Sequence, residues 1–508
     1  MVASRPIVPQ DVGIQTPFST IGNVLVAGPN TSQIKDGGIL PSFVFNVRSY
    51  GAVGDNVAND TAAFSAAILA AYTAWNNNTA QPQIVYIPRG VYKITSAIVP
   101  NSINGGLING FVSFIGDGGM NSLLNVSASF TGDLFPFSNI WQVGPGGNVF
   151  PAGGTGAILS SGLRCNVHIR GLGVIGDRTS ATMGNLFAFY DAADFVEMSD
   201  IFVQYWPGRV IWGGIMNQST TACLRESIFS NLRFFNCGNT SAPVIEIDSN
   251  GTGATTPSNE LAFRDIDIYA PYGDGISVHS SNNTTTNIRF VRIRVEGREP
   301  GFGALPGDLF RIGNTTDLTN VTNIHMSKML LLNPQVSHYA LNIIKGSGSA
   351  LNPFNIFFQG SVSGVSGTGA GIQILAGRYM QFYPWISTAG TGVTIGPSSG
   401  GVQSNLFFQD GGANSPWTWN VDSTSISAVV TASNNSARHA GIPAGGTTGL
   451  GLVMSTTNNF GIFFGSGVPT LSAAQGSLYL RSDGNSTSTR LYVNTNGTTT
   501  WTAVTTVA

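Results

Sequence analysis

The stretch FNVRSYGAVGDNVANDTAAFSAAILAAYTAW, residues 45–75, decides the fold that we expect for this 508-residue chain. It predicts a short strand, a Gly-Asp turn and then a helix in which apolar side chains recur at helical spacing. Asp60 or Thr61 is the expected N-cap, because an oxygen there accepts a hydrogen bond from a free N–H group of the first turn. The stretch QIVYIPRGVYKIT, residues 83–95, follows and predicts two strands around a Pro-Arg-Gly turn.

The composition of the whole chain favours β structure. The chain has 65 glycines and is 42% hydrophobic, but only 9% of its residues are charged. Disorder needs low hydrophobicity and high net charge, and a helical protein would carry many more exposed Glu and Lys residues. Glycine and asparagine supply turns, while Val, Ile, Thr and Phe supply strands. We therefore expect an all-β protein with many turns.

Charge and cysteine content exclude several classes of partner. The net charge of −2 excludes a nucleic-acid partner, because phosphate binding needs an excess of Lys and Arg. We expect no membrane span, since no apolar run approaches about 20 residues, and no secretory signal, since MVASRPIVPQ lacks an apolar core. Cys165, Cys223 and Cys237 are too few for a disulfide framework or a zinc site, so we expect them reduced and buried. No metal or other cofactor is expected.

A loose repeat runs from about residue 105 to 412. Lines such as VEMSDIFVQYW (196–206), LAFRDIDIYAPYG (261–273) and IRFVRIRVEGREP (288–300) are each followed by a second short strand. They recur roughly every 24–36 residues, a period that is typical of stacked repeats. The loops between them vary in length, as in a parallel β-coil where each turn adds one rung and insertions project outward.

The motif of residues 43–98, with its strand, Gly-Asp turn, capped helix and Pro-Arg-Gly turn, resembles the pectate-lyase superfamily in the form found in bacteriophage tailspikes and capsule depolymerases. The resemblance implies a right-handed parallel β-helix whose N-terminal end is capped by the helix. It also implies a homotrimer. The paired-aspartate, His-Gly and Arg-x-Lys motifs of the polygalacturonase branch are absent apart from GDGI at 273–276, and the Lys and Arg motifs of calcium-dependent pectate lyases are not recognisable. Neither mechanism is therefore transferred.

The predicted fold class is all-β, a right-handed parallel β-helix with an N-terminal capping helix and a C-terminal β-domain. By the resemblance, residues 1–42 form an N-terminal arm that binds a virion tail or baseplate protein. Residues 43–104 form the N-terminal cap and residues 105–412 the polysaccharide-binding shaft. Residues 413–508, whose ending looks like C-terminal segments of phage tail proteins, form a β-rich trimerisation or receptor domain. The expected location is the virion tail.

Aligning the repeats on their inward residues brings charges together on the outside. The inward residues are Ile266 and Ile268, Ile293 and Val295, and Met329 and Leu331. Because strand side chains alternate between faces and rungs lie about 4.8 Å apart, Arg233, Asp267 and Arg294 fall into one outward column. Tyr269 and Glu296 fall into the next. Asp267 and Glu296 are then one rung and two residues apart, on the order of 8 Å, which fits the ~6.5–9.5 Å between the carboxyl groups of inverting glycosidases. They are the first candidates for catalysis.

A second group of ionisable residues is expected on the strand that follows. Glu246 shares a column with Arg311 and has Asp248 and His279 as neighbours, while Asp274 lies in the loop between the two strands. Glu246 and Asp274 are the alternative catalytic carboxylates. Arginines suit anionic sugars, and a tyrosine ring suits pyranose stacking. The candidate substrate-binding residues are Tyr269, Arg294, Arg233, His279 and Asp248.

A structural explanation of the same charges stays open. Opposite charges on adjacent rungs satisfy each other, so the ladder can be purely structural or an ion pair in a trimer interface. Asp265 is expected to be a turn residue, because its counterparts Asp200, Asn231 and Arg292 occupy corner positions of the repeat.

The predicted function is a trimeric tailspike that binds bacterial capsular polysaccharide or lipopolysaccharide and depolymerises it by glycoside hydrolysis. Three alternatives remain: a non-enzymatic fibre or adhesin of the same fold, a polysaccharide lyase, and a purely structural virion component. The lyase would act by β-elimination on a uronic acid, with Arg294 or His279 as the base and typically a metal.

Overall fold

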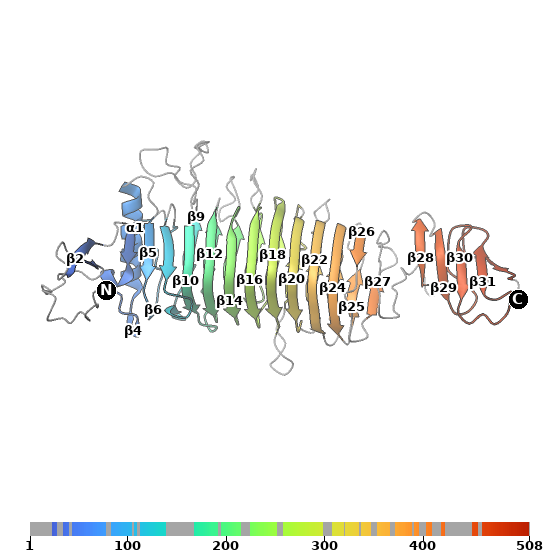
Figure 1. Cartoon of the computed structure of the whole chain (residues 1–508), viewed down its shortest axis with the longest axis horizontal. Coiled ribbons are helices and arrows are strands. Elements are labelled where there is room, and N and C mark those ends of the chain that lie inside the picture. The colour runs from blue at the N-terminus through green and yellow to red at the C-terminus, as the bar shows by residue number, and fades with distance from the viewer. Residues whose placement is uncertain are drawn as a thin grey trace, which may run out of the picture. The chain divides into compact units, whose positions relative to one another are not determined.

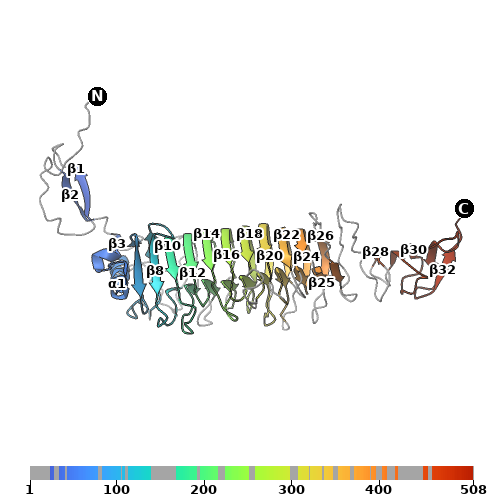
Figure 2. The ribbon, with the colours of Figure 1, turned by 90° about the horizontal axis from the view of Figure 1, so that it is seen from below.

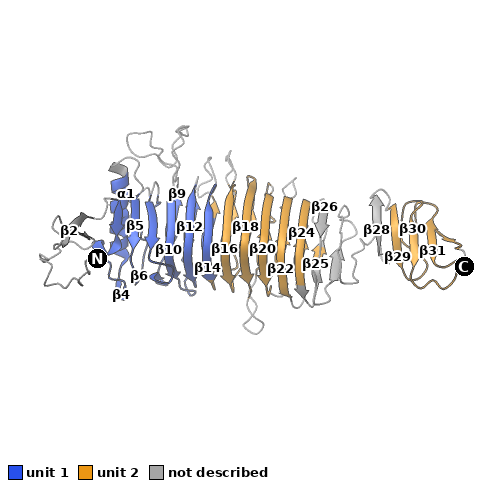
Figure 3. Cartoon of the chain, in the orientation of Figure 1, with its two compact units in different colours: residues 1–212, 224–234 blue, residues 213–223, 235–508 orange. Residues whose placement is uncertain are grey.

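The chain forms two compact units, residues 1–212 with 224–234 and residues 213–223 with 235–508 (Figure 3). The computed structural model describes residues 23–27, 34–39, 43–77, 83–103, 106–108, 112–138, 167–190, 195–214, 224–250, 258–297, 307–319, 321–334, 337–346, 353–365, 371–388, 391–395, 403–408, 418–421, 450–455 and 460–506.

The first unit begins with an antiparallel hairpin and continues as parallel strands. The hairpin is formed by β1 (Asn23–Ala27) and β2 (Ile34–Ile39). One parallel sheet contains, in order, β3 (Val44–Asn46), β5 (Gln83–Ile87), β7 (Val112–Gly116), β10 (Val167–Ile175), β12 (Val196–Gln204) and β14 (Ile228–Phe235). This sheet is joined through β10 by β8 (Ser122–Val126), β6 (Gly90–Ile94) and β4 (Asp55–Asn59). A second sheet begins with β9 (Phe135–Ser138), which pairs with β11 (Phe187–Tyr190), and continues into β13 (Ile211–Gly214).

The helix expected from the opening stretch is α1 (Thr61–Asn77), which follows a 3-10 helix η1 (Val47–Tyr50). It packs against β3 and β5, as Figure 1 shows, and buries the side chains of Phe64 and Trp75. The carboxylate of Asp60 accepts hydrogen bonds from the N–H groups of Val53 (2.7 Å) and Gly54 (3.2 Å), so it closes the Gly-Asp turn. The same residue therefore ends the turn and precedes the helix.

The second unit contains two parallel sheets whose strands alternate along the chain. In Figures 1 and 2 their strands lie side by side as successive rungs. One sheet contains β16 (Leu261–Tyr269), β18 (Thr285–Glu296), β20 (Val321–Leu332), β22 (Phe354–Val365), β24 (Gly377–Thr388) and β26 (Gln403–Phe408). The other contains β15 (Ile245–Asp248), β17 (Ile276–His279), β19 (Phe310–Ile312), β21 (Leu341–Ile343), β23 (Ile372–Ile374), β25 (Thr391–Ile395) and β27 (Thr418–Val421).

The strands β16, β18 and β20 turn a corner near their middle at a residue in a left-handed conformation. Asp265, Arg292 and Lys328 have φ values of 55°, 57° and 55°, in the left-handed region that few non-glycine residues adopt. Asp200 and Asn231 occupy the same position in the first unit, with φ values of 53° and 51°. The predicted corner positions are therefore confirmed. As a consequence each of these strands supplies two faces, one before this corner and one after it.

The interior of the second unit is a column of apolar side chains, each worth about 1.5–3 kcal/mol when fully buried. The rings of Phe263 and Phe290 stack on adjacent rungs with centroids 4.9 Å apart. The residues predicted to point inward are all at most 2% exposed: Ile266, Ile268, Ile293, Val295, Met329 and Leu331. The prediction of a right-handed parallel β-helix is confirmed by these stacked parallel strands.

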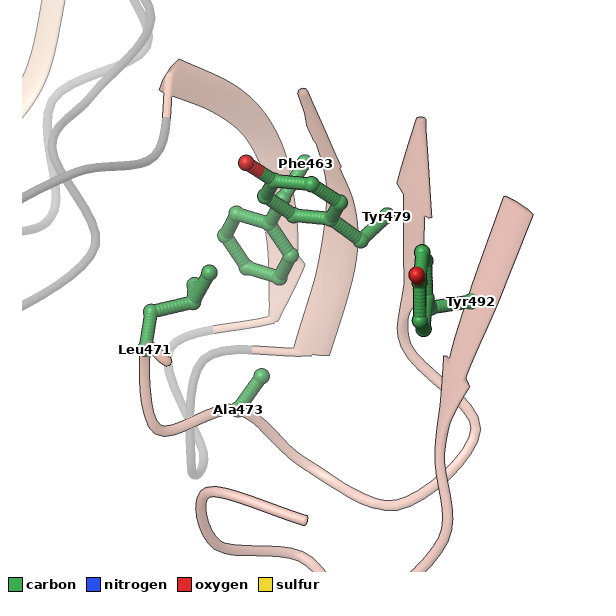
Figure 4. Close-up of a cluster of buried hydrophobic side chains, with 5 residues drawn as sticks. All are labelled: Phe463, Leu471, Ala473, Tyr479 and Tyr492. Carbon is green, nitrogen blue, oxygen red and sulfur yellow. The ribbon is translucent and has the colours of Figure 1, made fainter. Parts of the chain in front are cut away.

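A separate five-stranded sheet lies near the C-terminus. Its core is shown in Figure 4, where Phe463, Leu471, Tyr479 and Tyr492 gather, and Trp501 packs against them. The strands, in order, are β28 (Leu450–Ser455), β29 (Phe460–Gly465), β30 (Leu478–Arg481), β31 (Leu491–Asn494) and β32 (Trp501–Val504).

The predictions on cysteines, membrane spans and domain boundaries have different outcomes. Cys237 is a buried, reduced thiol, as expected, and its Sγ donates to the carbonyl oxygen of Phe235 (3.3 Å), while Cys165 and Cys223 lie outside the described residues. No helix in the described part of the chain has the length and apolarity needed to span a bilayer. The predicted boundaries of the arm, cap, shaft and C-terminal domain stay predictions.

Candidate functional site

The face after the corner carries a continuous line of outward side chains from β16 to β24. Asp267 pairs in register with Arg294, which pairs with Leu330, and the line continues through Ser361 to Trp385. These five residues are called the outer row. The predicted register of Asp267 with Arg294, and of Tyr269 with Glu296, is thus present in the structure.

The two first candidates for catalysis lie on adjacent rungs of this face. Glu296 is held by Arg294, whose Nη2 donates to Glu296 Oε2. The Glu296 side chain is only 10% exposed, whereas that of Arg294 is 49% exposed. Asp267 is half-buried and has no hydrogen-bond or ion-pair partner among the described residues. The pair therefore consists of one fixed carboxyl group and one that is available to a ligand.

Aromatic rings lie beside this pair. The centroids of Phe235 and Tyr269 are 6.1 Å apart and their planes are tilted by 47°. Both side chains are half-buried, so each leaves part of a ring accessible. An accessible ring next to a carboxyl pair is a suitable surface for the apolar face of a pyranose.

Arg233 is exposed on β14 in the first unit. Its position in a column with Asp267 stays a prediction.

The second predicted group forms a buried network around His279. Its Nε2 lies 2.9 Å from Glu246 Oε1, and its Nδ1 lies 3.2 Å from Asp317 Oδ1 and 3.4 Å from Asp248 Oδ1. All four side chains are at most 10% exposed. Although burial opposes it, hydrogen bonds to Asp317 and Glu246 and the charge of Asp248 together raise the pKa of His279 to about 10.

The loops after the strands complete this network. Ser281 donates from its N–H group (2.9 Å) and its hydroxyl (2.7 Å) to Asp248. The backbone N–H groups of Ser280 and Asn314 both donate to Asp317 Oδ2. The imidazolium thus ties neighbouring rungs and a loop together. The imidazolium and the carboxylates of Glu246, Asp248 and Asp317 are engaged with one another, which favours a structural role for the network over sugar binding.

Asp274 has the electrostatics of a general acid. It is buried at the corner before β17 and pairs with Arg311 of β19. Burial raises the pKa of Asp274 to about 6, in spite of the opposing charge of Arg311. A carboxyl group with such a pKa can donate a proton near neutral pH. Both of its oxygens are already engaged, however, since Oδ1 accepts from the N–H group of Asp308 (2.8 Å) and Oδ2 faces Arg311.

The sequence alone did not single out Asp308 and Asp317. Asp308 accepts hydrogen bonds from the N–H group of Tyr339 (2.9 Å) and from Asn342 Nδ2 (2.7 Å). Both aspartates lie just outside the strands, where loop lengths differ from rung to rung. The repeat therefore held no signal that would align them with Asp274 or His279. Among the described residues no group of three or more His, Cys, Asp or Glu side chains is arranged to hold a metal ion.

A polar hollow of about 280 Å³ lies on the first unit and was not predicted. His168 Nδ1 lies 3.1 Å from Glu197 Oε2 on the neighbouring strand, and their side chains are 40% and 53% exposed. The hollow is lined by Ile115, His168, Arg170, Glu197 and Ser199.

Asp265 supplies a matched control for Asp267, two residues away. Arg292 Nη2 donates to Asp265 Oδ2 (2.7 Å), and both side chains are exposed at the corner. Exposed ion pairs contribute little to stability, and asparagine also tolerates the left-handed conformation. We expect Asp265→Asn to leave the midpoint of denaturant-induced unfolding unchanged. A lower midpoint would show that this ion pair stabilises the corner.

Comparison with known proteins gives one family match and several similar solved structures. Residues 44–198 match the model of a family described as rhamnogalacturonase A/epimerase, pectate lyase-like, which confirms the predicted resemblance for that segment. The structure is similar to ORF18 of Geobacillus virus E2, at 14% identity over 91% of this chain and 76% of that chain, with a TM-score of 0.44. It is similar to the A-module of the Azotobacter vinelandii mannuronan C-5 epimerase AlgE6, at 13% identity over 77% of this chain and 100% of that chain, with a TM-score of 0.44. A search of curated proteins finds no match.

Proposed function

We propose that this protein binds a bacterial surface polysaccharide on the outward face of its second unit and depolymerises it by glycoside hydrolysis. One observation carries the proposal: Asp267 and Glu296 occupy adjacent rungs of one outward face, beside the ring of Tyr269. By standard strand dimensions their Cα atoms are separated by about 8 Å. Side chains that project from Cα atoms at this spacing can place two carboxyl groups on opposite sides of a sugar, with a water molecule between one of them and the ring.

The two carboxyl groups take different roles in this proposal. Arg294 orients and neutralises Glu296, which suits the base that accepts a proton from water. Asp267 has no cation partner in the described chain, which suits the acid. The bond between the anomeric carbon and the bridging oxygen breaks, and that oxygen takes the proton of Asp267. The hydroxyl of the water adds to the anomeric carbon while its proton passes to Glu296.

The biological setting in this proposal is a phage tail. The motif of residues 43–98 and the family match over residues 44–198 support a pectate-lyase-like scaffold. The resemblance to phage tailspikes supports assembly as a homotrimer, attachment to the tail through residues 1–42, and a capsule or lipopolysaccharide glycan as the ligand.

The decisive experiment is incubation of the full chain with purified capsular polysaccharides and lipopolysaccharide. We expect one polymer to become shorter by size-exclusion chromatography, with new reducing ends and no absorbance from unsaturated uronates. Binding without shortening would indicate an adhesin. Shortening with that absorbance would indicate a lyase, and no binding to any glycan would indicate a structural virion component.

A further inference from the structure

We propose that the outer row is an extended subsite for uncharged sugar residues, reaching from the Asp267–Glu296 pair to Trp385. This inference rests on the proposed function and adds the chemical class of the sugars and the length of chain that the protein contacts. It is carried by the register of the row, by the absence of charge along most of it, and by the exposure of its last residue.

The register makes the row a straight line along the stack of rungs. Each of its five residues is the in-register partner of the next, on five consecutive strands of one sheet. Four steps of about 4.8 Å give a length on the order of 19 Å. A line of that length contacts several consecutive sugars, so a polymer would use it fully and a disaccharide would not.

The side chains along the row are matched to neutral sugars. After Arg294 the row continues with Leu330, Ser361 and Trp385, none of which is charged. The neighbouring column continues from Glu296 through Leu332 to Ser363, which are also uncharged. Serine hydroxyls can bond sugar hydroxyls, while leucine and tryptophan contact the C–H faces of the rings. A carboxylate on a sugar beside Ser361 or Trp385 would lose water without gaining a cation partner from that part of the row, which is unfavourable.

The exposed side chain of Trp385 is the strongest indication that a ligand binds at this end of the row. Its side chain is 44% exposed, whereas Trp75 and Trp206 are at most 1% exposed. It makes no ring contact or hydrogen bond with the described residues. The row begins at the carboxyl pair, where the scissile bond would lie, and ends at this large exposed indole. The indole is therefore suited to hold another sugar ring of the same chain. The polar neighbour Ser361 favours a wet sugar surface over a dry contact with another protein chain.

The test compares Trp385→Ala and Trp385→Phe with Tyr379→Ala. Tyr379 is a matched control because it is 54% exposed, lies outside the outer row and packs edge-to-face on Phe354. Binding is measured on full-length protein that also carries Glu296→Gln, so that no cleavage is needed. The probes are the polysaccharide that binds in the previous experiment, its carboxyl-reduced form, and its fragments of two or three sugars.

We expect Trp385→Ala to weaken binding of the long polymer on the order of 10-fold. Trp385→Phe should restore most of the affinity, and Tyr379→Ala should have no effect. Binding of the short fragments should not change. In the cleavage assay with Glu296 intact, Trp385→Ala should raise KM for the polymer with little change in kcat. The contribution of Trp385 should be the same at low and high salt, and with the carboxyl-reduced polymer.

Three results would overturn the inference. They are unchanged polymer affinity in Trp385→Ala, an effect of Trp385 that disappears with carboxyl reduction or salt, and a change in oligomeric mass that would place Trp385 in a subunit interface.

Failure of this inference can be distinguished from failure of the proposed function. A loss of cleavage in Asp267→Asn with no effect of Trp385→Ala removes only the subsite. A Trp385-dependent affinity with cleavage intact in Asp267→Asn removes only the catalytic assignment. Absence of binding to every surface glycan removes both.

Discussion

Asp267→Asn and Glu296→Gln are each expected to lower the rate of polysaccharide cleavage by about 10²–10⁴-fold, the usual contribution of a general acid or base. Asparagine at 267 keeps the size of the side chain but has no carboxyl proton to donate to the departing oxygen. Glutamine at 296 cannot accept a proton from water, and it also loses the ion pair with Arg294. The measurement is the rate at which new reducing ends form, and the loss should appear in kcat with binding largely kept.

The control for this prediction is Asp265→Asn, which removes a carboxylate two residues from Asp267 at the exposed corner. Full activity in the control and loss in both site variants would locate the chemistry on the face after the corner. If Asp267→Asn and Glu296→Gln cleave normally while Asp274→Asn does not, the acid is instead the buried carboxyl group paired with Arg311.

His279→Asn is expected to destabilise the second unit by about 3–5 kcal/mol, because it leaves a buried cluster of carboxylates without its cation. The imidazole nitrogens contact Glu246, Asp317 and Asp248 within 3.4 Å, and all these groups are almost fully buried. Asparagine retains one donor but no charge. The measurement is the midpoint of denaturant-induced unfolding followed by circular dichroism.

The matched control is His168→Asn on the first unit. His168 also lies close to a carboxylate, at 3.1 Å from Glu197, but both side chains are largely exposed. Exposed pairs contribute about 0–1 kcal/mol, so this variant should unfold close to the parent protein. Equal shifts in the two variants would contradict the view that the His279 network stabilises the fold through its burial.

The His279 network also predicts a pH dependence. Its folded-state pKa of about 10 lies above the ordinary value of 6.5. The imidazolium therefore contributes its full stabilisation below about pH 6.5, and this is lost as the pH rises toward 10. Wild-type stability should fall across that window, and the fall should be smaller in His279→Asn. An identical slope in both proteins would show that other groups set the pH dependence.

Much of the fold and part of the candidate site could be predicted from the sequence. The opening motif gave the helix and its turn, and the alternation of apolar residues gave the inward side chains Ile266, Ile293 and Leu331. The same alternation, together with the corner residues Asp265 and Arg292, gave the register of Asp267 with Arg294. These features depend on neighbours in the chain and on one constant spacing between rungs, so they are local properties that a sequence expresses directly.

Only the tertiary structure decided which outward residues are covered and which remain available. Glu296 was expected to face outward and His279 to bind substrate, yet the Glu296 side chain is only 10% exposed beside Arg294, and His279 is enclosed with Asp317 from a loop on the next turn. The sequence by itself determined which residues lie opposite one another, because a period of two and a repeated corner leave little freedom in the register. It did not determine burial, because burial depends on where loops of unequal length and long charged side chains come to rest, and no repeating pattern specifies those positions.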